Sequence, residues 1–525
     1  MTSIHTLGEL RSSGYRVRSV KDEMRANLLA ALGRGEPTFP GIHGYERTVV
    51  PAIHNAILSK HDIILLGLRG QAKTRILRSL TALLDEATPI IEGCEINDSP
   101  FDPTCKRCRR LAADKGNDLP IAWIGRDARY REKLATPDVT VADLIGDIDP
   151  IKAANQRLTY ADEEVIHYGI IPRTNRGIFA INELPDLAPR IQVALLNILE
   201  ERDLQIRGFP VRIPMDVVLV FSANPEDYTS RGNIITPLKD RIESQILTHY
   251  PQNVETARRI TDQEAWLDRD ATAKIEIPVY VRDLIENIAF VARGSELVDQ
   301  SSGVSARLTI AAIELLHSNL ERRAAVTRDK LVYPRLSDLS MVLPAITGKV
   351  EMVYEGEQQG AEVVARKLIS LALAKLFESK FPAIERAGVA QRAERSRGYG
   401  EIDPDDLDDA FAGRRGKRKE AREEPKAPPP SEPAYDAILE WFAAGNKITV
   451  SDEQPFAAYR AELDRVPRLA EVARQYSGAT SEEELAFWME LVLEGLHQSL
   501  RLTREDLDST ITFQELLKFN MLRKV

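Results

Sequence analysis

The sequence is poor in cysteine. It has three cysteines among 525 residues, all within the stretch 92–108. An odd, clustered set does not build the disulfide framework of a small secreted protein. No apolar run approaches the roughly 20 residues of a membrane-spanning helix, and the N-terminus lacks the apolar core of a signal peptide. We therefore expect a cytoplasmic protein without a membrane span.

Net positive charge is missing as well. The formal charge of −10 argues against a general nucleic-acid binder, although a local basic patch remains compatible with it. With 43% hydrophobic and 29% charged residues, the composition is that of a soluble globular protein. A chain of 525 residues is long enough for two to four domains with sizeable cores.

Hydrophobic periodicity divides the chain into five parts. Short apolar runs at 62–67, 120–125, 177–182 and 217–224 are typical of strands buried on both faces, and helical patterns separate them. This alternation predicts an α/β region with a parallel sheet flanked by helices. The expected parts are a helical arm at 1–36, the α/β region at 37–255, an all-α region at 256–400, a charged and proline-rich linker at 401–435, and a separate C-terminal helical domain at 436–525.

The stretch Gly67 to Thr74, GLRGQAKT, is close to a phosphate-binding loop. The standard pattern is glycine, four residues, then Gly-Lys-Ser/Thr after a buried strand and before a helix. We predict that the loop residues Gly67, Gly70, Gln71, Ala72 and Lys73 bind the phosphates of ATP and that the Thr74 hydroxyl binds Mg²⁺. Alanine replaces the second glycine at Ala72, and a position with ordinary dihedral angles would tolerate it.

Polar residues at the ends of later elements complete the predicted site. The apolar run 177–182 ends in Asn182, and Glu183 follows it. An acidic pair is expected at these two positions: an aspartate for the Mg²⁺ shell and a glutamate that polarises the attacking water. Here asparagine replaces the aspartate and the glutamate is kept. Asn224 ends the next strand, Arg241 follows it, and Arg307 begins a later helix.

This set of motifs resembles the AAA+ ATPases, and within them the branch of MoxR-type ATPases and the ATPase subunit of magnesium chelatase. The resemblance covers roughly residues 37 to 350, with the stretch from Asp143 similar to the branch's hairpin-helix insertion. MoxR-type loops commonly read Gly-x-Pro-Gly-x-Ala-Lys-Thr/Ser, which matches Ala72. The resemblance implies an AAA+ P-loop NTPase core followed by an all-α lid. It also implies that Asn224 is sensor 1, Arg241 the arginine finger reaching a neighbouring subunit, and Arg307 sensor 2 on the lid.

The resemblance implies an ATP hydrolase that forms a hexameric ring and remodels a partner protein carrying a von Willebrand A domain. Two alternatives stay open. One is the motor subunit of a magnesium or cobalt chelatase. The other is a nucleotide-binding scaffold with little hydrolysis, for which Asn182 is the main support. The Gly-Ala-Phe-Thr-Gly-Ala loop of σ54 activators is absent from the sequence, which argues against transcription activation.

The cysteines suggest a second kind of site. Cys94, Cys105 and Cys108 could hold three corners of a tetrahedral zinc site, with Asp98 or Asp102 as the fourth ligand. Such a set can also stay without metal in a reducing cytosol, so both interpretations remain open.

Overall fold

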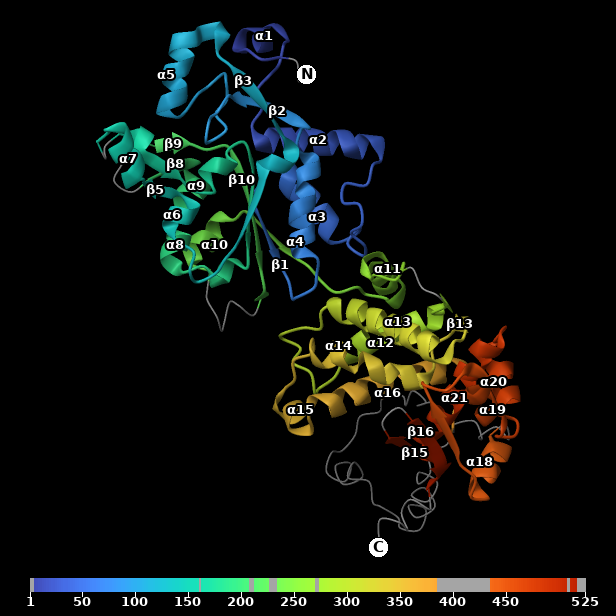
Figure 1. Ribbon diagram of the computed structural model, residues 1–525. Coiled ribbons are helices and arrows are strands. Elements are labelled where there is room, and N and C mark those ends of the chain that lie inside the picture. Colours follow the sequence, from blue (N-terminus) through green and yellow to red (C-terminus); the bar gives the residue numbers. More distant parts are fainter. Residues whose placement is uncertain are drawn as a thin grey trace, which may run out of the picture. The chain divides into compact units, whose positions relative to one another are not determined.

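The structure is a computed structural model that describes residues 4–159, 162–206, 212–225, 234–269, 273–384, 435–507 and 510–516. The chain divides into two compact units, one of residues 1–263 with 300–306 and one of residues 264–299 with 307–525. Figure 1 labels their elements. The predicted linker at 401–435 lies outside the described residues except for Tyr435.

Five parallel strands form the main sheet of the first unit. In spatial order they are β11 (Ser244–Leu247), β1 (Ile63–Leu66), β10 (Val217–Ala223), β7 (Gly177–Asn182) and β4 (Tyr130–Leu134). Every residue of β1, β7 and β10 is buried, as expected for apolar strands covered on both faces. The predicted parallel sheet is therefore confirmed.

One predicted strand belongs to a different sheet. The apolar run at 120–125 forms β3 (Ile121–Gly125), which pairs antiparallel with β2 (Ala87–Ile91) instead of joining the parallel sheet. The fifth parallel strand is β4, whose sequence YREKL carries three charges and whose residues are either partly buried or exposed. An edge strand does not need an apolar sequence, so apolar runs do not indicate β4, and the prediction that the run at 120–125 belongs to the parallel sheet is wrong.

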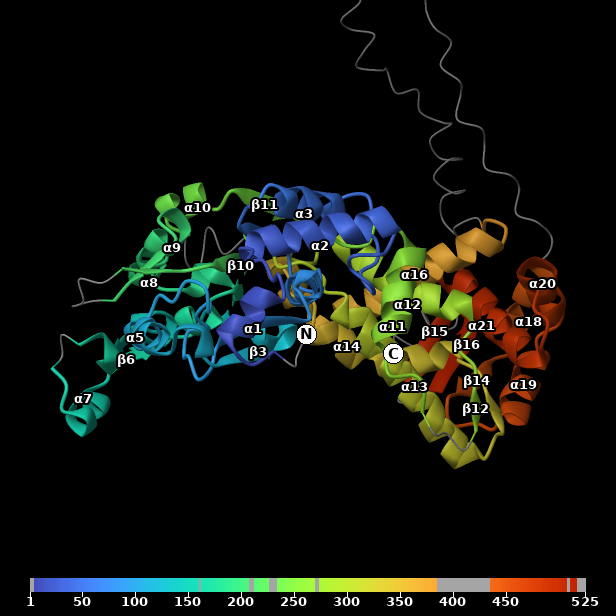
Figure 2. The same cartoon turned by 90° about the horizontal axis from the view of Figure 1, so that it is seen from above.

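Helices cover both faces of the sheet. Val218 and Val220 of β10 pack with α2 (Val20–Arg34), α3 (Val49–Leu58) and α4 (Lys73–Ser79), whereas Leu219 and Phe221 face the other core. α2 lies alongside α3 (Figure 2). Its carboxylate Glu23 accepts two hydrogen bonds from Arg129, at 2.7 and 2.6 Å, and both side chains are buried. Residues 20–34 are thus part of the first unit's core.

The predicted hairpin-helix insertion is confirmed. Strands β5 (Gly146–Ile148) and β6 (Ile166–Tyr168) form an antiparallel pair with α7 (Pro150–Gln156) between them. Among the described residues of the first unit, the remaining α-helices and strands are α1 (Leu7–Ser12), α5 (Lys106–Lys115), α6 (Val141–Leu144), α8 (Pro189–Ala194), α9 (Leu196–Glu200), β8 (Asp203–Gln205), β9 (Arg212–Pro214), α10 (Thr236–Arg241) and α11 (Val254–Glu264).

The second unit contains the predicted helices of the lid and of the C-terminal segment. Its first part comprises β12 (Lys274–Ile275), α12 (Val279–Arg293), α13 (Arg307–Thr327), β13 (Leu331–Val332), α14 (Leu343–Thr347), α15 (Tyr354–Gln359) and α16 (Ala361–Lys380). Its second part comprises α18 (Asp436–Ala443), β14 (Ile448–Ser451), α19 (Phe456–Asp464), α20 (Leu469–Ser477), α21 (Glu482–Gln498), β15 (Leu502–Leu507) and β16 (Thr510–Glu515).

The C-terminal segment also contains a sheet that the sequence analysis does not predict. Strands β14, β16 and β15 pair antiparallel in that order. The residues TITF at the start of Thr510–Glu515 alternate between polar and apolar side chains, which is the signal of a half-buried strand, whereas Leu502–Leu507 is apolar only at its two ends. The strong helical pattern at 482–498 dominated the prediction for this region.

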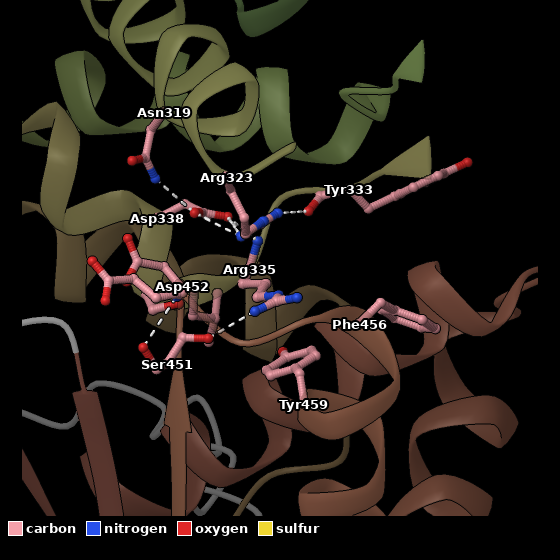
Figure 3. A network of polar contacts seen from close by, with 12 residues as sticks. Asn319, Arg323, Tyr333, Arg335, Asp338, Ser451, Asp452, Phe456 and Tyr459 are labelled. Atoms are coloured by element: carbon pink, nitrogen blue, oxygen red, sulfur yellow. Dashed lines mark hydrogen bonds and ion pairs between the residues drawn. The ribbon is translucent and has the colours of Figure 1, made fainter. Parts of the chain in front are cut away.

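A buried polar network joins the C-terminal segment to the lid helices. Asp338, which is fully buried, accepts hydrogen bonds from Arg323 Nη1 at 2.6 and 2.8 Å and from Asn319 Nδ2 at 2.7 Å (Figure 3). Arg335 donates to the Ser451 carbonyl at 2.7 Å and lies over the Tyr459 ring. These contacts join Ser451 and Tyr459 to the lid within one compact unit. Among the described helices, none is both long and apolar enough to cross a membrane.

Candidate nucleotide-binding site

The predicted phosphate loop leaves the carboxyl end of β1 and enters α4. The Gly67 N–H donates to the Ala223 carbonyl at the end of the neighbouring strand β10, at 3.1 Å. Gly70 has a φ of 73°, and a Cβ atom there would collide with the side chain of Ser305. In open parallel sheets ligands bind beyond the carboxyl ends of the strands, which is where this loop lies.

Ala72 does not have ordinary dihedral angles. Its φ is 58° and its ψ is 16°, in the left-handed region that disfavours residues with a Cβ atom. The residue directly precedes α4, where the standard pattern has glycine. The loop therefore keeps the backbone of a glycine-containing phosphate loop at the cost of local strain.

The side chain of Lys73 is bound to three oxygens of this site. Its ammonium donates to the Gly67 carbonyl, to the Leu68 carbonyl at 3.2 Å and to Asn224 Oδ1 at 2.7 Å. Only 7% of Lys73 is exposed. The lysine and the predicted sensor Asn224, which are 151 residues apart in sequence, are thus brought together.

The backbone of the loop offers donors for an anion. Among the residues that the structure describes, the N–H groups of Gly70, Gln71 and Ala72 donate no hydrogen bond to the protein. Successive amide groups of this kind, followed by a helix start and a lysine, form an anion-binding concavity. The residues present therefore fit the phosphates of a nucleotide.

Asn182 and Thr74 meet at the ends of β7 and α4. The Asn182 side-chain oxygen accepts hydrogen bonds from Thr74 Oγ1 at 3.4 Å and from Ser222 Oγ at 3.2 Å. Ser222 also accepts from the Glu183 backbone N–H at 3.3 Å. Glu183 is half-buried and has a left-handed backbone, with a φ of 56°. These contacts fix the turn that follows β7, and they place an uncharged oxygen acceptor beside the hydroxyl predicted to bind Mg²⁺.

Residues that the sequence analysis did not single out anchor the loop from the far side. The Tyr45 hydroxyl lies 3.0 Å from the Gln71 carbonyl and 2.7 Å from the His249 carbonyl. Burial raises the pKa of Tyr45 to about 12, so the hydroxyl keeps its proton as a donor. Thr248 Oγ1 donates to Gln71 Oε1 at 2.6 Å. In the sequence, these residues are marked only by position: Tyr45 lies just before α3, and Thr248 follows β11 directly.

Among the described residues, Arg241 forms no hydrogen bond or ion pair with the loop. It ends α10, forms an ion pair with Glu200 at 2.7 Å and donates to the Pro237 carbonyl at 3.0 Å. Its side chain is 30% exposed. The partner in this ion pair, Glu200, is the last residue of α9.

Arg307 begins α13, which belongs to the second unit. The segment 300–306 before it belongs to the first unit, where the Ser302 carbonyl accepts a hydrogen bond from Arg69 Nε at 3.2 Å. The loop and the chain that leads to Arg307 are therefore in contact within the first unit.

The three cysteines and Asp98 form a separate buried cluster. Their ligand atoms all lie within 4.8 Å of one another, and Asp98 rather than Asp102 is the acidic member. Hydrogen bonds with the Cys105 and Cys108 thiols lower the pKa of Cys94 to about 4, and burial raises the pKa of Asp98 to about 6. The hydrogen bond with Cys105 raises the pKa of Cys108.

The sheet, the loop and the polar residues at the strand ends define a P-loop nucleotide-binding protein. The family model described as AAA domain (dynein-related subfamily) matches residues 122–242, a stretch that contains Asn182, Glu183, Asn224 and Arg241 and begins after the phosphate loop.

Curated relatives narrow the class to a branch. The chain is 26% identical over 202 residues to the magnesium-chelatase 67 kDa subunit of Heliobacterium mobile, which covers 38% of this chain and 29% of that protein. It is 25% identical over 205 residues to the magnesium-chelatase 38 kDa subunit of Acidiphilium rubrum, covering 38% and 55%. The chain thus spans less than two thirds of either relative. With the domain match, these relatives confirm the resemblance to AAA+ ATPases of the branch that contains the magnesium-chelatase subunits.

Among solved structures, a complex between the BchI and BchD subunits of magnesium chelatase is 19% identical, with a TM-score of 0.29, covering 65% of this chain and 97% of that one.

Proposed function

We propose that the chain is a ring-forming, hexameric ATPase that couples MgATP hydrolysis to remodelling of a partner protein with a von Willebrand A domain. The observation that carries the ATPase part is the meeting of Lys73, Asn224 and the pair Thr74–Asn182 at the carboxyl ends of three neighbouring strands. Ring, partner and MoxR-type function are carried over from the branch that the sequence resembles.

The described contacts suggest a role for each residue. Bound nucleotide supplies a triphosphate whose terminal bond is cleaved by water. Lys73 would exchange its three oxygen partners for phosphate oxygens, and the loop N–H groups would hold the remaining charge. The Glu183 carboxylate would accept a proton from the attacking water. Once Lys73 has released the Asn224 side chain, Asn224 would orient that water.

Paired variants test the ATPase assignment. Glu183→Gln should bind ATP with the parent affinity and hydrolyse it about 10² to 10⁴ times more slowly, since the amide accepts a proton poorly. Lys73→Ala should lose binding or turnover. Glu201→Gln, at an exposed glutamate after α9, is the matched control and should behave like the parent. A Glu183→Gln protein that hydrolyses ATP at the parent rate would show that the carboxylate has been misassigned.

The role of Arg241 requires a neighbouring subunit. Within the described part of the chain, Arg241 forms no hydrogen bond or ion pair with the loop, and its ion pair with Glu200 is partly exposed, so the guanidinium can be released at small cost. An arginine beside a γ-phosphate raises turnover by several orders of magnitude in related systems. Arg241→Ala should therefore keep ATP binding and lose turnover. Arg18→Ala, which breaks a comparably exposed pair with Asp85, should change neither.

Mixing two inactive proteins tests the shared site directly. When Arg241→Ala and Lys73→Ala proteins form mixed rings, some interfaces combine an intact loop with an intact arginine, so part of the activity should return. Subunit exchange is checked by fluorescence transfer between labelled chains. No recovery of turnover in rings that do exchange subunits contradicts the assignment of Arg241 to the neighbouring site.

A motor subunit of a magnesium or cobalt chelatase is the second candidate, supported by the similarity to two chelatase subunits. A deletion strain that accumulates metal-free porphyrin would favour it, whereas co-purification of a von Willebrand A protein with the tagged chain favours the first. An ATPase assay of the unmodified protein distinguishes the third possibility, a nucleotide-binding scaffold, from these two. A scaffold would bind ATP and show no turnover at any protein concentration.

A further inference from the structure

We propose that Cys94, Asp98, Cys105 and Cys108 bind one structural zinc ion. The cluster lies outside the nucleotide site, and the proposal does not depend on ATP turnover. Its ligand atoms all lie within 4.8 Å of one another. In a tetrahedral site with metal–sulfur bonds of about 2.3 Å, donors lie roughly 3.5 to 4 Å apart. A small inward movement of the four side chains would therefore complete the coordination.

The burial of the cluster calls for a cation. Asp98 and Cys108 have no exposed surface, and Cys94 and Cys105 are exposed by 9% and 7%. Among the described residues, no lysine, arginine or histidine forms an ion pair with Asp98. A buried carboxylate is costly unless it is paired or binds a metal. A zinc ion would supply the missing positive charge, and three thiolates are the sulfur ligands that zinc prefers.

Hydrogen bonds from neighbouring groups already orient three of the four ligands. Thr104 Oγ1 and the Cys105 N–H donate to the two oxygens of Asp98, at 2.5 and 2.9 Å. The Asp98 N–H donates to Cys94 Sγ at 3.3 Å, and the Cys108 N–H donates to Cys105 Sγ at 3.4 Å. Donors of this kind fix the direction of metal ligands and stabilise thiolates. The spacing Cys105-x-x-Cys108 is that of a zinc knuckle.

The metal would hold the start of α5 against the loop that follows β2. Cys105 caps α5, and the first residue of this helix reaches the insertion: Lys106 Nζ pairs with Asp162 at 2.8 Å, and its N–H donates to Glu163 at 2.9 Å. Arg109 also pairs with Glu163, at 3.0 Å. The zinc site would thus fix the position of α5, and through α5 the second half of the hairpin-helix insertion.

Metal analysis of the full chain tests the site. Protein purified under reducing conditions from zinc-containing medium should hold one zinc per chain by elemental mass spectrometry. After zinc is removed with a chelator, Co²⁺ should give the thiolate charge-transfer and tetrahedral d–d bands of a sulfur-rich site. Full-length protein that contains no stoichiometric zinc and gives no such cobalt spectrum would overturn the proposal, and so would a disulfide between two of the cysteines in the native protein.

Matched variants test the ligand set. Asp98→Asn should weaken zinc binding by about 10-fold or more, because the neutral amide is a poor zinc ligand, whereas Asp102→Asn, at an exposed residue outside the cluster, should keep the parent affinity. Equal affinities of the two variants would exclude Asp98 as the fourth ligand. For Cys108→Ser, the zinc affinity is measured by competition with a zinc-binding dye, and the stability of α5 is measured by hydrogen exchange. Because these readouts need no ATP, they are independent of the ATPase assignment.

Discussion

The left-handed backbone of Ala72 allows the sign of a stability change to be predicted. An L-residue in this conformation costs about 1 to 2 kcal/mol relative to the right-handed form, and glycine carries no such cost. Glycine also makes the unfolded chain more flexible, which opposes the gain by about 0.4 to 1 kcal/mol. With the φ of 58° at Ala72, Ala72→Gly should therefore stabilise the first unit by roughly 0.5 to 1 kcal/mol.

A second alanine provides the control. Ala30 is exposed within α2, where the backbone is helical, so Ala30→Gly should destabilise the same unit by about 1 kcal/mol. The two variants make the same chemical change and differ in the sign of φ. Each kcal/mol should move the melting temperature by roughly 2 to 4 °C for a unit of this size. Hydrogen exchange of β1 and β10 assigns the transition to the first unit.

Two results would refute this reasoning. One is a loss of stability in Ala72→Gly as large as that in Ala30→Gly, which would mean that residue 72 is not held in the left-handed region. The other is a loss of ATP binding in Ala72→Gly, because the glycine keeps the loop backbone and should leave the affinity within a few fold.

Three further substitutions have expected outcomes. Asn182→Asp keeps the oxygen acceptor and adds a charge beside Thr74, so turnover should rise; an unchanged rate shows that the asparagine is not a brake. Tyr45→Phe removes the one hydroxyl proton that the Gln71 and His249 carbonyls share, and it should cost about 1 to 3 kcal/mol in stability and weaken ATP affinity in calorimetry. Asp338→Asn leaves Arg323 buried without its counter-ion, so denaturant unfolding of the second unit should show a loss of about 3 to 5 kcal/mol. The control is the exposed ion pair of Glu362 with Arg366, where Glu362→Gln should change stability by less than about 1 kcal/mol.

The elements with strong periodicity were predictable from the sequence. The runs at 62–67, 177–182 and 217–224 are strands of the parallel sheet, because a strand covered on both faces must be apolar along its length. The helix at 20–34 lies within the predicted helical arm at 1–36 and ends at a left-handed Gly35. β4 and the hairpin of β15 and β16 were not predicted, since their positions at the edge of a sheet or on a half-buried hairpin permit charged residues.

The sequence allowed the prediction of those site residues that lie at or directly after the ends of the predicted strands. Lys73, Thr74, Asn182 and Asn224 lie where the ends of parallel strands converge, and hydrogen bonds join Lys73 to Asn224 and Thr74 to Asn182. The contacts of Tyr45 and Thr248 with the loop span about 26 and 177 residues in sequence, and no local pattern encodes such a pairing. The ion pair of Arg241 with Glu200 depends in the same way on how two short helices meet, which periodicity does not report.

The two departures from the standard motif act on different properties. At Ala72 the departure affects the backbone: the loop is strained, but its N–H groups and Lys73 keep their places, so folding stability bears the cost. At Asn182 the fold is undisturbed, because the amide oxygen accepts the hydroxyls of Thr74 and Ser222 as a carboxylate would, and only a negative charge is missing. A cation is attracted less strongly by an amide than by a carboxylate. We would therefore attribute slow hydrolysis in the parent protein to Asn182 and low stability to Ala72. If the two effects are independent, the double variant Ala72→Gly/Asn182→Asp should show the stability gain of the first substitution and the faster turnover of the second.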